Sequence, residues 1–149
     1  RATIVRWVTE WYETHIVFRY AGEDAPGEMP RYELGELPEG FVENLESQFV
    51  GTGMTAHFYE NEKGDVILFE YIYMQQGSLS GASTENAYVV SVSINRCEGL
   101  LVIPKEEDSN SMLMWLDPEH DLQFTLDAPL GQEDILHMAE SVHLVETMK

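Results

Sequence analysis

The sequence has very little positive charge. Its 149 residues include 8 Lys and Arg against 27 Asp and Glu, which gives a formal net charge of −19. Binding to a phosphate backbone depends on clustered Lys and Arg, and anionic lipid repels a protein this acidic. The composition therefore argues against nucleic acid as a partner and is typical of a domain that surface acids keep soluble. A cation or a basic partner is the alternative reason for so many acids.

Cysteine is almost absent. The single thiol, Cys97, excludes an internal disulfide, a Cys-x-x-Cys redox pair and a cysteine zinc site. It follows Asn95-Arg96 at a predicted strand junction, where we interpret it as a small packing residue rather than a nucleophile. A domain without disulfides fits the cytoplasm, and equally the outside of a bacterium that uses few of them.

Long apolar runs are absent too. No stretch approaches the roughly 18 residues of a membrane span, and no signal peptide is present. The sequence begins at Arg1 rather than at Met, so we expect it to be a trimmed part of a longer protein. Any targeting segment of that protein is expected upstream of Arg1.

The motifs of common enzyme and metal sites are missing. Gly51-Thr52-Gly53 lacks the Lys and the helix that a phosphate loop needs, and no Gly-x-Ser-x-Gly elbow occurs. His137 and His143 are six residues apart, off a common helical face. The acids of 106–108 and 117–121 lack the fixed Gly and terminal Glu of an EF-hand, so we interpret them as solvated turns. We predict no catalytic residue, cofactor or metal ligand, with a metal site built in three dimensions from scattered histidines as the alternative.

The last third of the chain is the most regular part of the sequence. Glu98 to Pro104, Met112 to Leu116 and Asp121 to Leu126 each combine apolar residues with flanking polar turns, which predicts three strands in series. Gly131-Gln132-Glu133-Asp134 then opens an amphipathic pattern, which predicts a helix over residues 131–147. A sheet of this kind must bury one face, and the helix is its nearest apolar cover.

The first residues predict a second helix. Over residues 1–13, Ile4, Trp7, Val8 and Trp11 fall at spacings of three and four and form one apolar stripe. We interpret the stripe as part of the core. A membrane-interface anchor and an aromatic platform for a ligand are the alternatives.

Between the two helices, residues 14–126 predict antiparallel strands. The clearest hairpin joins Thr55–Glu60 to Asp65–Tyr73, and Tyr88–Ile94 alternates apolar and polar residues. The Ser- and Gly-rich stretch Gln75–Asn86 predicts a mobile surface loop. The sequence therefore predicts one α+β domain over residues 1–149. Its curved antiparallel sheet has about six or seven strands in a meander, with an N-terminal and a C-terminal helix packed on it.

Four motifs resemble a known family. They are Leu37-Pro38-Glu39-Gly40-Phe41, the run from Phe58 to Asp65, Leu113-Met114-Trp115-Leu116-Asp117, and His137-Met138-Ala139-Glu140-Ser141-Val142. Together they resemble a bacterial extracytoplasmic domain family of unknown function over about residues 37–145. That family often follows one transmembrane helix in Firmicutes proteins described as anti-sigma-factor-like. Gly131 departs from the family's Ser at the helix N-cap, a change that costs only a few tenths of a kcal/mol.

The resemblance implies a cellular location and a role, but it implies no catalytic residues. It implies a non-enzymatic sensing or binding domain, outside the cytoplasm and anchored to the cell membrane through a segment that this sequence lacks. Its partner would be a protein or a small ligand outside the membrane, and anti-sigma activity would reside in a cytoplasmic segment. Trp7, Trp11 and Trp115 are the candidate binding or interface residues. A small-ligand or lipid carrier, and a small hydrolase on a cone-shaped sheet, are the alternative functions.

Overall fold

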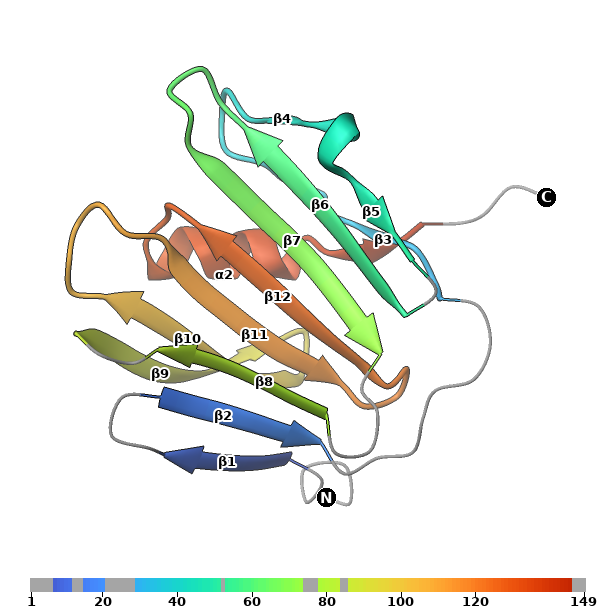
Figure 1. The fold of residues 1–149 in the computed structure, drawn as a ribbon, viewed down its shortest axis with the longest axis vertical. Coiled ribbons are helices and arrows are strands. Elements are labelled where there is room, and N and C mark those ends of the chain that lie inside the picture. The colour runs from blue at the N-terminus through green and yellow to red at the C-terminus, as the bar shows by residue number, and fades with distance from the viewer. Residues whose placement is uncertain are drawn as a thin grey trace.

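A curved, unclosed antiparallel sheet dominates the protein (Figure 1). The computed structural model describes residues 7–11, 15–20, 29–51, 53–73, 78–83 and 86–145. The sheet has eight strands in the order β4-β6-β7-β12-β11-β10-β9, with β5 beside β6 after β4. Its strands are β4 (Val42–Glu43), β5 (Phe49–Val50), β6 (Met54–Glu60), β7 (Val66–Tyr73), β9 (Ala87–Ile94), β10 (Cys97–Pro104), β11 (Ser111–Asp117) and β12 (Leu122–Ala128).

Shorter elements surround this sheet. A 3₁₀ turn, η1, lies between β4 and β5, and one helix, α2, follows β12. Two further sheets are small: β1, β2 and β8 pair in the order β1-β2-β8, and β13 pairs with β3. Their bounds are η1 (Leu45–Ser47), α2 (Gln132–Glu140), β1 (Trp7–Trp11), β2 (His15–Tyr20), β3 (Tyr32–Glu33), β8 (Ser78–Ser83) and β13 (His143–Leu144).

The predicted hairpin of β6 and β7 is confirmed. His57 lies opposite Phe69 in its register. The turn is closed by the side chain of Asn61, whose Oδ1 accepts from the backbone N–H of Lys63 and Asp65 at 3.0 and 2.9 Å. Gly64 takes the positive φ of 87° that the turn requires.

The predicted meander occurs as two blocks. Strands β9 to β12 follow one another in the sheet as they do in the chain, and β12 then pairs with β7, with Leu126 opposite Phe69. The chain therefore leaves the sheet after β7, forms β8 elsewhere and returns at the far edge. Local patterns predicted each block, but the pairing that joins the blocks is a long-range contact.

The predicted N-terminal helix is wrong over the residues that the structure describes. Trp7–Trp11 is the strand β1, paired with β2 so that Trp7 lies opposite Tyr20 and Trp11 opposite Ile16. Trp, Val and Thr all favour extended backbone, and this preference outweighs a stripe of only four apolar positions. Residues 1–6 and 12–14 of the predicted helix lie outside the described residues.

The predicted loop Gln75–Asn86 is wrong at its centre. Ser78–Ser83 is the strand β8, which pairs with β2 and places Ser78 opposite Tyr20. Ladder hydrogen bonds come from the backbone, so a strand at the edge of a small sheet can form without large apolar side chains. Positions 75–77 and 84–85 of the predicted loop lie outside the described residues.

The C-terminal helix is shorter than predicted. It begins after the Gly131 N-cap, as expected, but ends at Glu140 rather than at residue 147. The Ser141 hydroxyl donates to the Met138 carbonyl at 2.6 Å and accepts from the backbone N–H of Gly35 and Glu36 at 3.1 Å each. Through these bonds the segment 35–36 holds the end of α2, and the chain continues into β13. Residues 146–149 lie outside the described residues.

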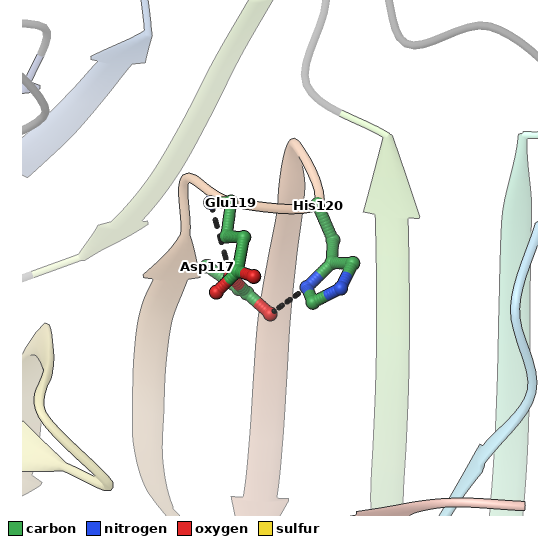
Figure 2. Close-up of side chains that lie close together, drawn as sticks. All are labelled: Asp117, Glu119 and His120. Atoms are coloured by element: carbon green, nitrogen blue, oxygen red, sulfur yellow. Dashed lines mark hydrogen bonds and ion pairs between the residues drawn. The ribbon is translucent and has the colours of Figure 1, made fainter.

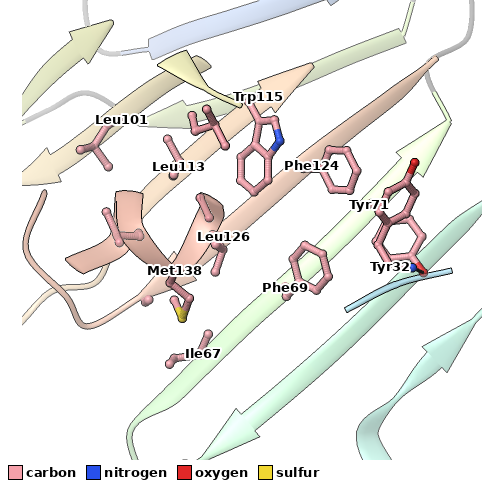
Figure 3. Packing of buried hydrophobic residues seen from close by; sticks show 14 of the residues in the cluster. Tyr32, Ile67, Phe69, Tyr71, Leu101, Leu113, Trp115, Phe124, Leu126 and Met138 are labelled. Carbon is pink, nitrogen blue, oxygen red and sulfur yellow. Dashed lines mark hydrogen bonds between the residues drawn. The ribbon is translucent and has the colours of Figure 1, made fainter. Parts of the chain in front are cut away.

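The larger buried cluster lies on one face of the main sheet, which we call the inner face, and a smaller cluster around Met114 is buried on the other face. Helix α2 covers the inner face over β9, β11 and β12 through Ile135, Met138 and Ala139. Beside the helix, Trp115, Phe124 and Phe69 project from β11, β12 and β7 to the same side (Figure 3). Burial of such side chains stabilises the fold by about 1.5 to 3 kcal/mol each.

Stacked rings continue the core across four strands. The ring centroids of Trp115 and Phe124 are 5.1 Å apart, those of Phe124 and Phe69 are 6.2 Å apart, and those of Phe69 and His57 are 5.9 Å apart. Tyr32 of β3 stands edge-on against Phe124 at 5.1 Å. The inner face is therefore filled with side chains both under α2 and under β3.

Candidate functional site

Trp115, the candidate interface residue of the C-terminal third, lies in the core. Its side chain is 3% exposed and stacks on Phe124. Trp7 and Trp11 lie at the two ends of β1, which belongs to the small β1-β2-β8 sheet rather than to the main sheet. The structure therefore does not gather the three tryptophans into one described surface. Their contact with a partner or ligand stays a prediction.

Cys97 opens β10 and is half-buried. Burial is the largest cause that raises the pKa of its thiol to about 11, and the acids Asp117 and Glu119 raise it further. At neutral pH the sulfur is therefore a neutral thiol, while a nucleophile or metal ligand needs the thiolate. These surroundings agree with a packing residue.

Three polar side chains converge in the turn between β11 and β12 (Figure 2). Asp117 Oδ2 and His120 Nδ1 are 2.8 Å apart, and Asp117 Oδ1 accepts from the backbone N–H of Glu119 at 3.1 Å. One ligand atom from each of Asp117, Glu119 and His120 lies within 4.8 Å of the others, the one such group of three in the described part of the chain.

The bonds in this turn have a sufficient structural role. An Asp at the first position of a turn commonly accepts from the backbone two residues on, as Asp117 does. Asp121 then takes a positive φ of 54° as the chain enters β12. The sequence predicted a solvated turn at 117–121, and the structure confirms the turn while adding the convergence of its side chains. Oxygen and imidazole donors suit several divalent cations, but hydrogen bonds within a turn do not themselves indicate a ligand.

A buried histidine on the inner face was not singled out from the sequence. His57 Nδ1 lies 2.8 Å from Glu43 Oε2 and 3.2 Å from Gln48 Nε2, and its ring stacks on Phe69. The two partners come from β4 and from the residue after η1. Because a buried polar group needs a partner, this triad anchors the irregular segment 42–50 to the sheet. Only the alternation of β6, which places His57 on the core face, signalled the site in advance.

The segment that His57 anchors carries four large apolar side chains that are more than half exposed. Val42, Leu45, Phe49 and Val50 are 70%, 70%, 52% and 62% exposed. We call these four residues the apolar edge, because β4 and β5 form one margin of the main sheet (Figure 1). The sequence is ambiguous here, since Phe41, Leu45 and Phe49 have a helical spacing, but it favours a strand that begins at Phe41. The structure forms two short strands, one on each side of η1.

The sequence that contains the apolar edge is acidic. From Tyr32 to Glu62 the sequence contains no Lys, Arg or Asp. The same stretch contains the following glutamates: Glu33, Glu36, Glu39, Glu43, Glu46, Glu60 and Glu62. A surface that combines exposed apolar groups with charge of one sign is typical of a protein-binding site.

The described residues also form two pockets at the surface. One, of about 280 Å³, lies between the segment 36–38 and α2, where His137 Nε2 and Glu36 Oε2 are 2.6 Å apart. The other, of about 380 Å³, is bordered by Asp65 and by the acids of 106–108. The first pocket borders Met138 at the side of α2. Between α2 and the sheet, Leu101, Leu113, Leu126 and Ile135 are each 0% exposed.

No helix among the described residues is both long enough and apolar enough to span a membrane. Among known proteins, no curated protein and no solved structure matches the chain significantly. One family model does match, over residues 31–142. This range runs from the start of β3 to just after α2 and is most of the chain. It includes the main sheet, the apolar edge and the acidic turn. The chain therefore belongs to the family described as domain of unknown function DUF4367.

Proposed function

We propose that this chain is a non-enzymatic extracytoplasmic domain of a single-span membrane protein, and that it binds a partner outside the membrane. The whole protein is then a regulator of the anti-sigma-factor-like type. The motifs between Leu37 and Val142 support the address, because the family they resemble often follows a transmembrane helix. The matched family itself has no stated function, so binding is argued from the surface.

The observation that carries the proposal is the apolar edge. Isolated domains protect their sheet edges with short strands, charges or covering loops, because an exposed apolar edge promotes aggregation. Here the strands are short, but Val42, Leu45, Phe49 and Val50 remain more than half exposed. A partner that covers these side chains gives them a reason to be apolar.

Two alternatives receive less support. A carrier for a lipid or small ligand needs a cavity under the helix, but α2 rests on side chains that exclude solvent, such as Leu113 and Ile135. A hydrolase needs converging acid and base groups. Three histidines contact acids, and each contacts a different one: His57 contacts Glu43, His120 contacts Asp117, and His137 contacts Glu36. They lie on a strand, in a turn and on the helix.

The address is tested in the full-length protein in its bacterial host. A C-terminal epitope tag and an added membrane-impermeant protease report the side on which this domain lies. We expect the tag to be removed from intact cells while a cytoplasmic control protein stays whole. A tag that is protected until the membrane is opened would refute the extracytoplasmic address.

Binding is tested by site-specific cross-linking in the same cells. A photo-reactive amino acid at Phe49 is expected to give a discrete cross-linked product of higher mass. The matched control is the same group at Tyr88, which is 60% exposed on β9, the opposite margin of the sheet. Equal products at both positions, or none at Phe49, would contradict a binding role for the apolar edge.

A further inference from the structure

The apolar edge presents apolar side chains on both faces of the sheet margin. In β6, Thr55, His57 and Tyr59 lie toward the inner face, since Tyr59 belongs to the core and His57 stacks on it and on Phe69. Strand neighbours share a face, so Val50, opposite Thr55, also lies toward the inner face. By the same rule, Val42 opposite Glu60 and Phe49 opposite Ala56 lie toward the outer face.

The backbone of this margin has one side paired. Strands β4 and β5 pair with β6, and within the described ranges no strand pairs with their other side. An added strand would bond there through its backbone, and its alternate side chains would fall on the two faces. Val42 and Phe49 would meet one set of these side chains, and Val50 the other.

Charge selects the kind of strand that fits. Glu43, Glu46 and Glu60 lie in or beside β4, η1 and β6, and the stretch from Tyr32 to Glu62 contains no Lys or Arg. A strand that carries Lys or Arg is attracted to this margin, and one that carries acids is repelled. A second copy of the chain would bring the same glutamates to the contact, so like charges oppose self-pairing.

We infer that the apolar edge binds an extended, basic segment of a partner protein by strand addition, with apolar and Lys or Arg side chains alternating along the segment. This inference rests on the proposed binding function and names the surface, the mode and the chemistry of the partner. The opposite margin of the sheet provides a contrast. There, on β9, the Lys105 ammonium lies 5.0 Å from the centroid of the Tyr88 ring, so a basic group already occupies that surface.

The test uses the purified 149-residue chain and synthetic peptides of about eight residues. The probe alternates Lys and Val. One control alternates Lys and Ser, which keeps the charge and removes the apolar side chains. A second control is the Lys-Val peptide with N-methyl groups on alternate residues, which removes the hydrogen-bond donors along one edge. Two-dimensional NMR locates the contact, and a titration gives the affinity.

We expect the Lys-Val peptide to shift the amide signals of residues 42–50 and of their β6 partners, and both controls to bind at least about tenfold more weakly. Val42→Lys and Val50→Lys should each lower the affinity for the Lys-Val peptide by a similar factor. Tyr88→Lys, on the other margin, should leave its affinity unchanged. Because all three sites are at least 60% exposed, the variants should fold, and an unchanged thermal melt verifies this.

Three results would overturn the inference. In the first, the Lys-Ser or N-methylated peptide binds as well as the probe, which indicates charge alone. In the second, the amide shifts lie away from residues 42–50. In the third, the chain pairs with itself through this edge, seen as a dimer that Val42→Lys abolishes. If the protease and cross-linking experiments succeed while the peptides fail, strand addition is wrong but the proposed function stands. Peptide binding by a domain found to be cytoplasmic would instead refute only the address.

Discussion

Gly99 allows a direct test of the packing at the centre of the sheet. It lies in β10 opposite Trp115 of β11, on the inner face. A Cβ atom at Gly99 would lie 2.6 Å from the Met114 carbonyl oxygen, 3.0 Å from Trp115 Cβ and 3.1 Å from Ile94 Cδ1. The Ile94 methyl can move aside, but the carbonyl belongs to the backbone of the neighbouring strand. Gly99→Ala therefore forces β10 and β11 apart or shifts the indole.

The cost follows from two opposing effects. Overpacking a well-filled core costs about 1 to 3 kcal/mol, while replacing a strand glycine by alanine returns about 0.5 to 1 kcal/mol of backbone entropy. We expect a net loss of about 1 to 2 kcal/mol in the free energy of unfolding. With a urea m-value of about 2 kcal/mol/M, the urea midpoint falls by about 0.5 to 1 M. The thermal midpoint falls by roughly 2 to 8 °C.

Gly53→Ala is the matched control, because a Cβ at Gly53 meets no heavy atom within 4 Å and its φ is not positive. It should match the wild-type chain or exceed its stability slightly. Parallel urea melts followed by tryptophan fluorescence measure all three proteins. A Gly99→Ala variant as stable as Gly53→Ala would refute the close approach of β10 and β11.

Three further predictions concern groups on or near the main sheet. Because the pKa of the Cys97 thiol is about 11 rather than 9.0, alkylation by iodoacetamide at about pH 8 should be roughly 100-fold slower in the native chain than in urea. Equal rates in the two solutions would contradict the burial. Glu43→Ala leaves His57 buried without its carboxylate partner and should lower the unfolding free energy by about 1 to 3 kcal/mol. The exposed Glu46→Ala should stay within about 0.5 kcal/mol in the same urea melts, and equal losses would argue against a role for the pair. Burial raises the pKa of Glu70. The native state therefore binds the carboxyl proton of Glu70 more tightly than the unfolded chain does. As the pH rises above the ordinary carboxyl pKa, the cost of ionising the buried group lowers the free energy of unfolding. Glu70→Gln should therefore raise the thermal midpoint at about pH 7 but not at about pH 3, and a pH-independent difference would refute this linkage.

The parts of the fold that were predictable have local causes. The β6–β7 hairpin is set by Asn61 and Gly64 in its turn, and the strands from Tyr88 to Leu126 follow from alternation and short polar connections. The start of α2 follows from Gly131 and the acids after it. Each of these signals lies within a few residues of the structure it specifies.

The errors have long-range causes. Trp7–Trp11 is extended because it pairs with β2, which pairs in turn with β8 some sixty residues later. The helix ends at Glu140 because Ser141 bonds to Gly35 and Glu36, about a hundred residues earlier. The exposure of the apolar edge could not be predicted from the sequence either, because its four side chains are of the types found in cores. They are exposed only because β4 and β5 lie at the margin of the sheet. Trp115 is the reverse case: the sequence made it a candidate for binding a partner, and the structure places it in the core.

The pairing of β3 with β13 has a mechanical consequence. The Val145 N–H donates to the Arg31 carbonyl at 2.7 Å, and Leu144 lies opposite Tyr32 in the next pair. Arg31 and Val145, at the outer ends of this pair of strands, are therefore adjacent. Tension applied at these two residues breaks the hydrogen bonds between β3 and β13 one after another, because the load falls on the end of the antiparallel pair. Detachment of β3 by such tension would expose the Tyr32 ring, which is buried in the folded protein.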